Sequence, residues 1–241
     1  MALFLIDHQK DNRIFFSTEV SHHMVRSLRK KPGDSIHASD GKGLIFTAII
    51  ESATNQNVEA VILDEEFIQK NWEVHVACSL IKKESRFEVF LEKATEIGVH
   101  RITPLQCERT VKPKLRVDRA RKIIQSAVQQ SFNPHVPILD SPMEFSTYIG
   151  QSGYKAHERY IATAVEREET RTLEQQYSGK NPVHILIGPE GDFTPEESEI
   201  ALKAGWNPVS LGMNRLRTET AAIAAVQIIK SCYQIKTQAT Q

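Results

Sequence analysis

The pattern of apolar and polar residues divides the chain near residue 70. Before that point, short runs rich in β-branched and aromatic residues alternate with Gly, Pro and Asp clusters, which is the pattern of strands and turns. The predicted strands are 3–6, 13–16, 44–50 and 58–63. A helix is predicted over 19–30, with an apolar face made of Val20, Met24, Val25 and Leu28. Strands at this spacing favour a small β-barrel.

From residue 73 onward, apolar runs alternate with amphipathic stretches. The predicted strands are 74–81, 99–105, 160–165, 183–187 and 209–211. The predicted helices are 85–97, 117–131, a helix from Pro195 to near Gly205 behind a Thr194 capping box, and about eighteen residues from Thr218. Such alternation implies a mainly parallel sheet covered on both faces. We therefore expect a β-rich domain over 1–71 and an α/β domain over 72–241.

Composition adds few constraints. The 241 residues include 30 Lys or Arg and 30 Asp or Glu, so the formal net charge is zero. No run approaches the roughly 18 uncharged apolar residues of a transmembrane helix. The apolar start of the chain meets Asp7 before a signal-peptide core can form. We expect a cytoplasmic protein that makes no membrane contact.

Cysteine and histidine spacing favours neither disulfides nor a metal site. The three cysteines, Cys78, Cys107 and Cys232, are odd in number and lack CxxC spacing, so we interpret them as buried thiols. The nine histidines form no HxxxH or HExxH motif. No metal is expected.

Positive charge is clustered despite the zero total. Between Arg101 and Lys122 there are eight Lys or Arg and two acids, and residues 21–31 hold four Lys or Arg, two His and no acid. A solvated helix face would explain either run. Two acid-poor runs in different domains fit better with a bound polyanion.

Two loops that follow predicted strands carry candidate chemistry. Residues 187–195 are rich in Gly and Pro, and Gly188 and Gly191 would allow a ligand to approach the backbone closely. This loop is not a phosphate loop, because Glu190 and Asp192 would repel phosphate. A ligand with a positive centre fits better, although the segment would also make an ordinary turn.

The second loop, residues 211–221, leads directly into an Ala-rich helix. Ala221, Ala222, Ala224 and Ala225 are small for a core face and suggest close packing against backbone or ligand. Their high helix propensity offers a simpler explanation.

Four motifs in order resemble one family. They are Lys93-Ala-Thr-Glu-Ile-Gly-Val99, Ile187-Gly-Pro-Glu-Gly191 followed by Phe-Thr-Pro-Glu-Glu197, Leu211-Gly212 with Leu216-Arg-Thr-Glu-Thr-Ala221, and an amino-terminal set of His23, Arg26, Leu28, Arg29, Pro32, Gly33 and Asp34. Together they resemble the RsmE family of 16S ribosomal RNA uridine N3-methyltransferases, within the SPOUT superfamily. The resemblance covers nearly the whole chain.

The resemblance implies a fold and a set of partners. The fold would be an N-terminal PUA-like, RNA-binding β-barrel and a C-terminal SPOUT α/β domain with a trefoil knot, a feature that is nearly absent from other proteins. The protein would act as a homodimer on 16S rRNA or the small ribosomal subunit. It would use S-adenosyl-L-methionine, held in a bent conformation by the knot loops.

Residue roles follow from the same resemblance. Arg217 and Glu219 are the candidate catalytic residues, with Arg217 stabilising charge on the uracil oxygen. The candidate cofactor residues are Thr163, Ile187, Gly188, Pro189, Glu190, Gly191, Leu211, Gly212, Leu216, Thr218, Thr220 and Ala221. The candidate RNA-binding residues are His23, Arg26, Arg29, Lys30, Arg109, Lys112, Lys114 and Arg116.

The chain departs from the family pattern at three places. Asp192 replaces a glycine after the GPEG motif, Asn214 replaces an arginine, and Phe132-Asn133-Pro134 stands where an arginine is expected nearby. The glycine loops remain, so cofactor binding should survive, whereas Arg215 is a candidate substitute for the arginine missing at position 214.

Three other functions fit parts of the pattern. A SPOUT enzyme that methylates the ribose 2′-oxygen would share the superfamily, and an rRNA-binding assembly factor would use the basic runs without catalysis. A metabolic α/β enzyme is disfavoured by the basic clusters. Retention of both glycine loops argues against a non-catalytic protein.

Overall fold

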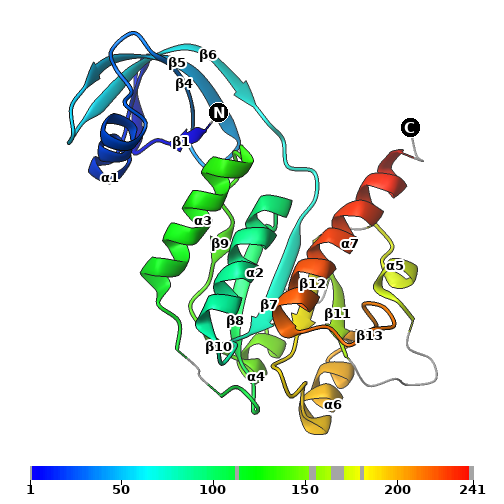
Figure 1. The fold of residues 1–241 in the computed structure, drawn as a ribbon. Helices are drawn as coiled ribbons and strands as arrows, with labels where there is room; N and C mark the ends of the chain where they lie inside the picture. Colours follow the sequence, from blue (N-terminus) through cyan, green and yellow to red (C-terminus); the bar gives the residue numbers. More distant parts are fainter. Residues whose placement is uncertain (1, 112–113, 152–155, 164–170, 180–181, 239–241) are drawn as a thin grey trace. The chain divides into compact units, whose positions relative to one another are not determined.

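The computed structural model describes the whole chain except residues 1, 112–113, 152–155, 164–170, 180–181 and 239–241 (Figure 1). Contacts divide the chain into two compact units. The first comprises Met1–Asn71 with Gln125–Val136, and the second comprises Trp72–Ile124 with Pro137–Gln241. Lys112 and the end of the predicted strand 160–165 lie outside the described residues.

The first unit is a curled six-stranded sheet. Its strands are β1 (Leu3–Leu5), β2 (His8–Lys10), β3 (Arg13–Phe15), β4 (Ser35–Ser39), β5 (Leu44–Ala53) and β6 (Val58–Phe67). The order is β1-β4-β5-β6-β3-β2, with β1 parallel to β4 and every other pair antiparallel. The edge strands β1 and β2 are consecutive in the chain, so the sheet must curl to bring its edges together. Phe46, Ile14 and Met24 lie in its core, each 0% exposed.

The predicted helix over 19–30 is wrong in its second half. An α-helix, α1 (Thr18–His22), continues as a π-helix, η1 (His23–Ser27), closed by a hydrogen bond from Leu28 N to His23 O of 3.2 Å. The wider turn rotates the chain, and Arg29 then takes φ +54°, which ends the helix. Leu28, expected on the apolar face, is 42% exposed.

A distant segment completes the first unit. The helix α3 (Val117–Ser131) ends there, and Pro134 O accepts a hydrogen bond from Gly43 N at 3.1 Å. His135 Nε2 donates to Ile68 O at 2.8 Å. A Cβ at Gly41, whose φ is +75°, would lie 2.8 Å from a methyl of Val136. The glycines of turn 40–43 are therefore required by this packing as well as by the turn.

The second unit contains a parallel sheet, as the alternation predicted. Its strands are β7 (Val74–Ser79), β8 (Arg101–Gln106), β9 (Ile138–Leu139), β10 (Met143–Glu144), β11 (Glu158–Ala162), β12 (Val183–Ile187) and β13 (Asn207–Val209). The order is β10-β8-β7-β12-β11-β13, and β9 also pairs with β8. Every residue of β7 and β12 is buried, which requires cover on both faces. β13 begins two residues earlier than predicted, and its Pro208 is tolerated because β13 is an edge strand.

Helices cover both faces of the parallel sheet. α7 (Thr218–Gln238) packs against α2 (Glu84–Ile97), β7 and β12 (Figure 1). The other face is covered by α4 (Phe145–Ile149) and α6 (Pro195–Lys203), where Phe145, Tyr148, Phe193 and Trp206 form one core cluster with the sheet. A short helix, α5 (Leu173–Gln176), precedes β12 and contacts α7. Among the described helices, none has both the length and the apolar character needed to cross a membrane.

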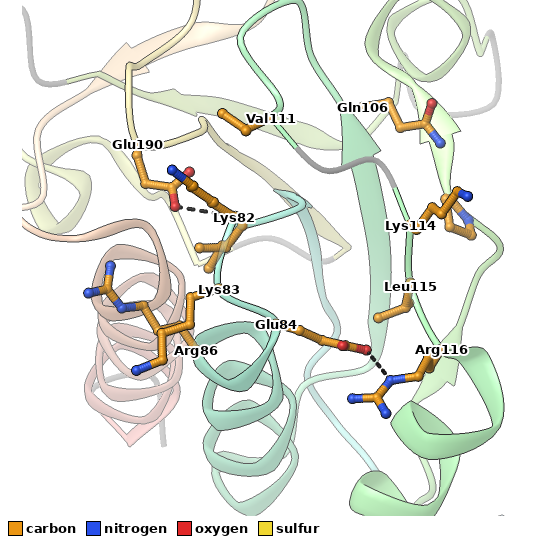
Figure 2. Close-up of a pocket in the computed structure, with 12 residues that line it drawn as sticks. Lys82, Lys83, Glu84, Arg86, Gln106, Val111, Lys114, Leu115, Arg116 and Glu190 are labelled. Carbon is orange, nitrogen blue, oxygen red and sulfur yellow. Dashed lines mark hydrogen bonds and ion pairs between the residues drawn. The ribbon is translucent and has the colours of Figure 1, made fainter.

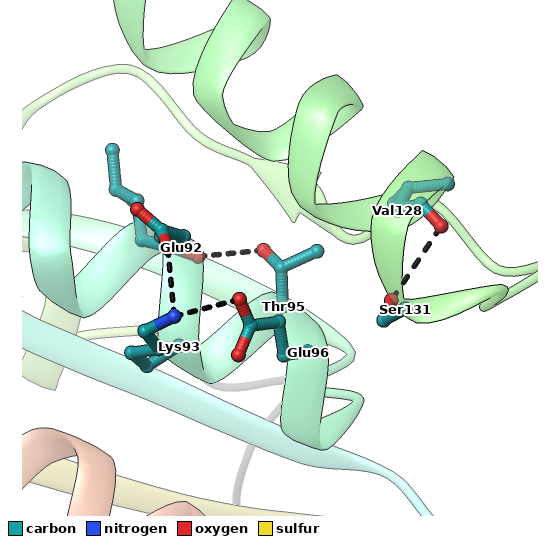
Figure 3. A network of polar contacts seen from close by, with 7 residues as sticks. Glu92, Lys93, Thr95, Glu96, Val128 and Ser131 are labelled. Carbon is teal, nitrogen blue, oxygen red and sulfur yellow. Dashed lines mark hydrogen bonds and ion pairs between the residues drawn. The ribbon is translucent and has the colours of Figure 1, made fainter. Parts of the chain in front are cut away.

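The motif at residues 93–99 forms the end of α2. Lys93 Nζ contacts the carboxylates of Glu92 and Glu96 at 2.7 and 2.8 Å, and the buried Thr95 hydroxyl donates to Leu91 O (Figure 3). Gly98 caps the helix with φ +104°, and a Cβ there would lie 3.2 Å from Trp72. These contacts give the motif a structural explanation.

We predict that His135 makes the stability of the protein pH-dependent. Burial lowers the pKa of His135 from its ordinary value of 6.5, so the folded state resists the proton that the unfolded chain accepts. The contribution of the neutral ring is complete above about pH 6.5 and is lost as the pH falls below it. His135→Gln keeps a donor for Ile68 O but cannot titrate, so its thermal midpoint should fall less between pH 7.5 and pH 5.5. Equal falls in both proteins would contradict the prediction.

Candidate active site

A cavity of about 1240 Å³ opens at the carboxyl ends of the parallel strands (Figure 2). Loops after β7, β8 and β12 meet here, because all strands of the sheet point the same way. The lining residues are Ile81, Lys82, Lys83, Glu84, Arg86, Gln106, Val111, Lys114, Leu115, Arg116, Pro142 and Glu190. Of the predicted site residues, the lining includes Glu190, Lys114 and Arg116.

The lining carries more positive than negative charge. Five of its side chains are cationic and two are carboxylates. The sequence analysis did not identify Lys82, Lys83 and Arg86 as site residues, although they follow closely after the continuous apolar strand β7. A basic run at the carboxyl end of a buried parallel strand is the signal that could have identified them.

The loop after β12 is held by contacts to the loops that follow β7 and β8. Glu190 Oε1 accepts a hydrogen bond from Lys82 N at 3.1 Å (Figure 2), and Gly191 O accepts one from Arg109 Nη1 at 2.6 Å. The aromatic ring of Phe193, 5% exposed, packs on Phe145 with ring centroids 5.4 Å apart. Ile187, Gly188 and Pro189 are buried, so this loop presents Glu190 and Gly191 at the surface.

Asp192 occupies the position where the family pattern has a glycine. Its φ of +63° lies in the left-handed region that favours glycine. Its own Oδ1 accepts a hydrogen bond from Phe193 N at 2.8 Å, and its N donates to Pro189 O at 2.9 Å. Asp tolerates this conformation better than most residues because its short side chain bonds the local backbone. The departure therefore leaves the turn intact.

The capping box predicted at Thr194 is confirmed and also connects two loops. Thr194 Oγ1 accepts from Glu197 N at 3.1 Å, and Glu197 Oε2 accepts from Thr194 N at 2.9 Å. The second oxygen of the Glu197 carboxylate accepts from Glu108 N at 2.9 Å, in the loop after β8. The buried carboxylate thus fixes the loops after β8 and β12 to each other.

The loop after β13 leaves room for a ligand. Gly212 has φ +123°, and a Cβ there would meet nothing within 4 Å. Ser210 Oγ accepts from Gly212 N at 3.2 Å, which closes the turn. Leu211, Leu216 and Ala221 are half-buried, Thr218 is buried and Thr220 is exposed. Thr163 lies beside this loop, its N donating to Val209 O at 3.2 Å.

Glu219 is a buried acid at the start of α7. It is 9% exposed, and its Oε1 lies 3.7 Å from Arg86 Nε. Its Oε2 is buried and has no hydrogen-bond partner among the described residues. A buried carboxylate oxygen without a hydrogen-bond donor lowers the stability of the folded protein. A ligand that brings a donor or a positive charge would offset this loss.

Arg217 is exposed, two residues before Glu219. Over the described part of the chain it has no ion-pair partner, since Glu219 pairs with Arg86 and Glu190 accepts from Lys82 N. Its backbone O accepts the hydrogen bond from Ala221 N that begins α7. The guanidinium is therefore available to a ligand.

Much of the basic run between 101 and 122 has a structural role. Arg101 pairs with Asp140 at 2.8 Å, Arg116 pairs with Glu84 at 2.8 Å, and Arg119 binds Glu88 through both donors. Hydrogen bonds from Arg116 and Arg119 lower the pKa values of Glu84 and Glu88, respectively. Lys114 is exposed at the cavity and forms no ion pair with another described residue.

The candidate RNA-binding residues of the first unit form one exposed segment. His23 and Arg26 lie on η1, and Arg29 and Lys30 follow it directly. His23, Arg26 and Arg29 are exposed, whereas Lys30 is half-buried and donates to Ser35 O at 3.3 Å. The π-helix and the residues directly after it therefore display three of the four side chains to solvent.

The thiols take no part in the site. Cys78 and Cys107 are buried and free, and burial raises the pKa of Cys107 to about 12. Cys232 is half-buried, so the prediction of buried thiols is wrong for this residue. Neither buried thiol is a nucleophile at neutral pH.

Comparison with known protein families shows that this chain is an RNA-modifying enzyme with a PUA unit. The chain belongs to the RNA methyltransferase family: the model of the RNA methyltransferase domain matches residues 69–230, and that of the RNA methyltransferase PUA domain matches residues 16–63. The resemblance to the RsmE family, with a PUA domain ahead of the methyltransferase domain, is confirmed.

Individual relatives agree with this assignment. The chain is 28% identical to ribosomal RNA small subunit methyltransferase E of Buchnera aphidicola, over 90% of this chain and 89% of the relative. A probable rRNA methyltransferase from Porphyromonas gingivalis matches with TM-score 0.88 and 34% identity, over 98% of this chain and 100% of that one. Ribosomal RNA small subunit methyltransferase E from Neisseria gonorrhoeae, bound to S-adenosylmethionine, matches with TM-score 0.87 and 25% identity, over 97% and 98% of the two chains.

We predict that Arg86 and Glu219 are energetically coupled. Arg86→Gln would leave a buried carboxylate without its cation and should lower the free energy of unfolding by about 1–2 kcal/mol. In a double-mutant cycle with Glu219→Gln, urea denaturation should give a coupling energy of at least about 0.5 kcal/mol. Strictly additive losses would show that the pair does not stabilise the start of α7.

Proposed function

We propose that this protein transfers a methyl group from S-adenosyl-L-methionine to N3 of a specific uridine in 16S ribosomal RNA. The observation that carries the proposal is the basic cavity at the carboxyl edge of the sheet, bordered by a glycine loop whose acid faces it, in a member of the RNA methyltransferase family. The relatives named small-subunit rRNA methyltransferases support the choice of substrate, and the relative bound to S-adenosylmethionine supports the choice of cofactor.

The residues around the loops fit this cofactor. The open space at Gly212 admits a ligand against the backbone, and the exposed carboxylate of Glu190 suits a ligand with a positive centre. Residues 187–191, 211–212 and 216–221 with Thr163 would hold it. As the resemblance implies, we also propose that the cofactor binds in a bent conformation and that the chain of the second unit forms a trefoil knot. When bound, the cofactor would supply the methyl group from its sulfonium centre. The sulfur would then leave as a neutral thioether, so the leaving group needs no metal to stabilise it.

Two side chains act on the target uracil, and each has a separate role. The N3 proton of uracil must leave as the N3–C bond forms, and negative charge then spreads onto the flanking carbonyl oxygens. Glu219 accepts this proton at its unpartnered Oε2, and Arg86 holds the carboxylate in place. Arg217 donates hydrogen bonds to a uracil oxygen, and its charge persists at every relevant pH.

The cationic side chains hold the RNA. Lys82, Lys83 and Lys114 at the cavity contact the phosphate backbone, and Arg109 holds the glycine loop while leaving guanidinium surface exposed. His23, Arg26, Arg29 and Lys30 of the first unit bind a further part of the RNA. The uridine is presented single-stranded or flipped from its stack, because N3 is inaccessible in a duplex. An enzyme with this substrate works in the cytoplasm.

We further propose a homodimer, with the partner subunit completing the site. The exposed run from Gly212 to Arg215 ahead of α7, which includes the fully exposed apolar side chain of Met213, supports this proposal. A specific dimer should bury at least about 1,200 Å² in total. Light scattering at micromolar concentration should report twice the 27.3 kDa of the chain. A monomer at that concentration would contradict the proposal.

Arg217→Ala should impair methyl transfer far more than cofactor binding. Loss of a charge that acts only in the transition state costs on the order of a hundredfold in rate. Arg217→Lys should restore part of the activity, because a point charge cannot reproduce the planar guanidinium. Single-turnover methylation of an rRNA fragment, measured beside calorimetric cofactor affinity, separates the two steps. An unchanged chemical step, or an equal loss in both measurements, would end the catalytic assignment.

Removal of the cavity cations should weaken RNA binding in a salt-dependent way. With Lys82, Lys83 and Lys114 replaced by Ala, the slope of log affinity against log salt should fall by about two. The control is Lys203→Ala, which removes an ammonium already paired with Glu199 at 2.7 Å on α6. If the triple variant and the control have the same slope, the cavity does not contact RNA backbone.

Mapping of methylated uridines tests the function itself. Small-subunit rRNA from cells that lack the protein should lose one N3-methyluridine, which the wild-type gene should restore and Arg217→Ala should not. Loss of a ribose 2′-O-methyl group instead would assign the ribose reaction. An unchanged modification pattern with a subunit assembly defect would assign the non-catalytic role.

A further inference from the structure

The amino edge of the parallel sheet, opposite the cavity, carries a cluster of imidazoles and a carboxylate. His75 is the second residue of β7, Glu73 immediately precedes that strand, and His100 immediately precedes the neighbouring strand β8. His100 N donates to Val74 O at 3.0 Å, which fixes the spacing between the two strand starts. The cluster is therefore built on paired strands rather than on free loops.

The ligand atoms of these three side chains converge. One atom from each of Glu73, His75 and His100 lies within 4.8 Å of the other two. The rings of His75 and His100 stack with centroids 5.3 Å apart and planes 10° from parallel. His75 is 8% exposed, whereas Glu73 and His100 are half-buried, so an ion can reach the group from solvent.

A second layer of side chains holds the buried imidazole. The His184 ring lies 4.3 Å from that of His75, centroid to centroid. Tyr148 Oη contacts His184 Nδ1 at 3.0 Å, and His157 Nδ1 contacts His184 Nε2 at 2.9 Å. Both nitrogens of His184 are thus already engaged, so His184 orients His75 and is not itself a ligand.

We propose that Glu73, His75 and His100 bind a divalent transition metal ion such as Zn²⁺. Two imidazoles and one carboxylate are a donor set that Zn²⁺ takes with water in the fourth position, at bond lengths of roughly 2.0–2.2 Å. Such bonds place the donor atoms roughly 3.4 Å apart, so the group must close slightly around the ion. The less buried Glu73 and His100 can make that movement, exchanging present contacts for the ion. The site lies beyond the methyl-transfer reaction and joins the starts of β7 and β8.

A metal site at this edge of the sheet differs from the expectation, drawn from the sequence, that the protein binds no metal. That expectation rested on ligand spacing, and residues 73, 75 and 100 match no metal-binding motif. The pairing of β7 with β8 brings His75 and His100 together, although 24 residues that include helix α2 separate them along the chain.

Cobalt titration tests the site. Full-length protein without an affinity tag, stripped with EDTA, is titrated with Co²⁺, and Zn²⁺ affinity is then measured by displacement. We expect one equivalent per chain with the visible absorption of a four-coordinate ion. Glu73→Gln and His100→Ala should each weaken Zn²⁺ binding at least tenfold, and the thermal midpoint of the wild-type protein should rise with Zn²⁺.

The control is His8→Ala, which removes an exposed histidine of the first unit and should leave Zn²⁺ affinity unchanged. Circular dichroism confirms that each variant is folded, and two variants at different positions guard against a folding defect in one. EDTA treatment should leave methyl transfer unchanged. Absence of saturable binding by the wild-type protein, or full affinity in both site variants, would overturn the proposal.

Discussion

The parallel direction of the strands in the second unit determines where its chemistry can lie. β7, β8 and β12 are adjacent and parallel, and their residues are almost all buried, so helices occupy both faces and leave only the two ends of the strands open. Loops that are far apart in sequence meet at the carboxyl end and form the cavity. The amino end gathers the residues that precede the strands, including Glu73 and His100.

Three carboxylates, two of them buried, then fix the loops at the carboxyl end. Glu197 bonds backbone groups from two loops, Glu190 accepts from the loop after β7, and Glu219 is held by Arg86 at the start of α7. Each acid is compensated by specific donors, which is the condition for placing charge in a partly buried site. One oxygen of Glu219 has no hydrogen-bond donor among the described residues, and we propose that a bound ligand supplies one.

The sequence predicted the elements whose period was long and regular. Residues 117–131 and 183–187 form the predicted helix and strand without a shift of boundary. β2 and β4 were missed because His8–Lys10 has no apolar residue and Ser35–Ser39 is short and mixed. The π-helix at His23 was missed because an i to i+5 turn leaves almost the same local pattern as an α-helix.

The candidate site was predictable only where a motif marked it. Gly188, Gly191 and Gly212 stand out because turns and close approach need glycine, whereas Lys82 and Arg86 resemble any exposed cation until the strands are placed side by side. The roles of Arg116 and Arg119 were likewise hidden, because their partners Glu84 and Glu88 lie about thirty residues earlier on another helix. Charge counted along the chain could not reveal that these arginines are paired with acids of α2.

Amide hydrogen exchange with and without S-adenosyl-L-methionine tests the central claim most directly. If the loops at the carboxyl end of the sheet hold the cofactor, exchange should slow over residues 187–194 and 210–221 at saturating cofactor. Exchange at residues 73–75 and 100, at the opposite end, should stay unchanged. Protection confined to the amino end or to the first unit, or no protection despite calorimetric binding at these concentrations, would contradict the account.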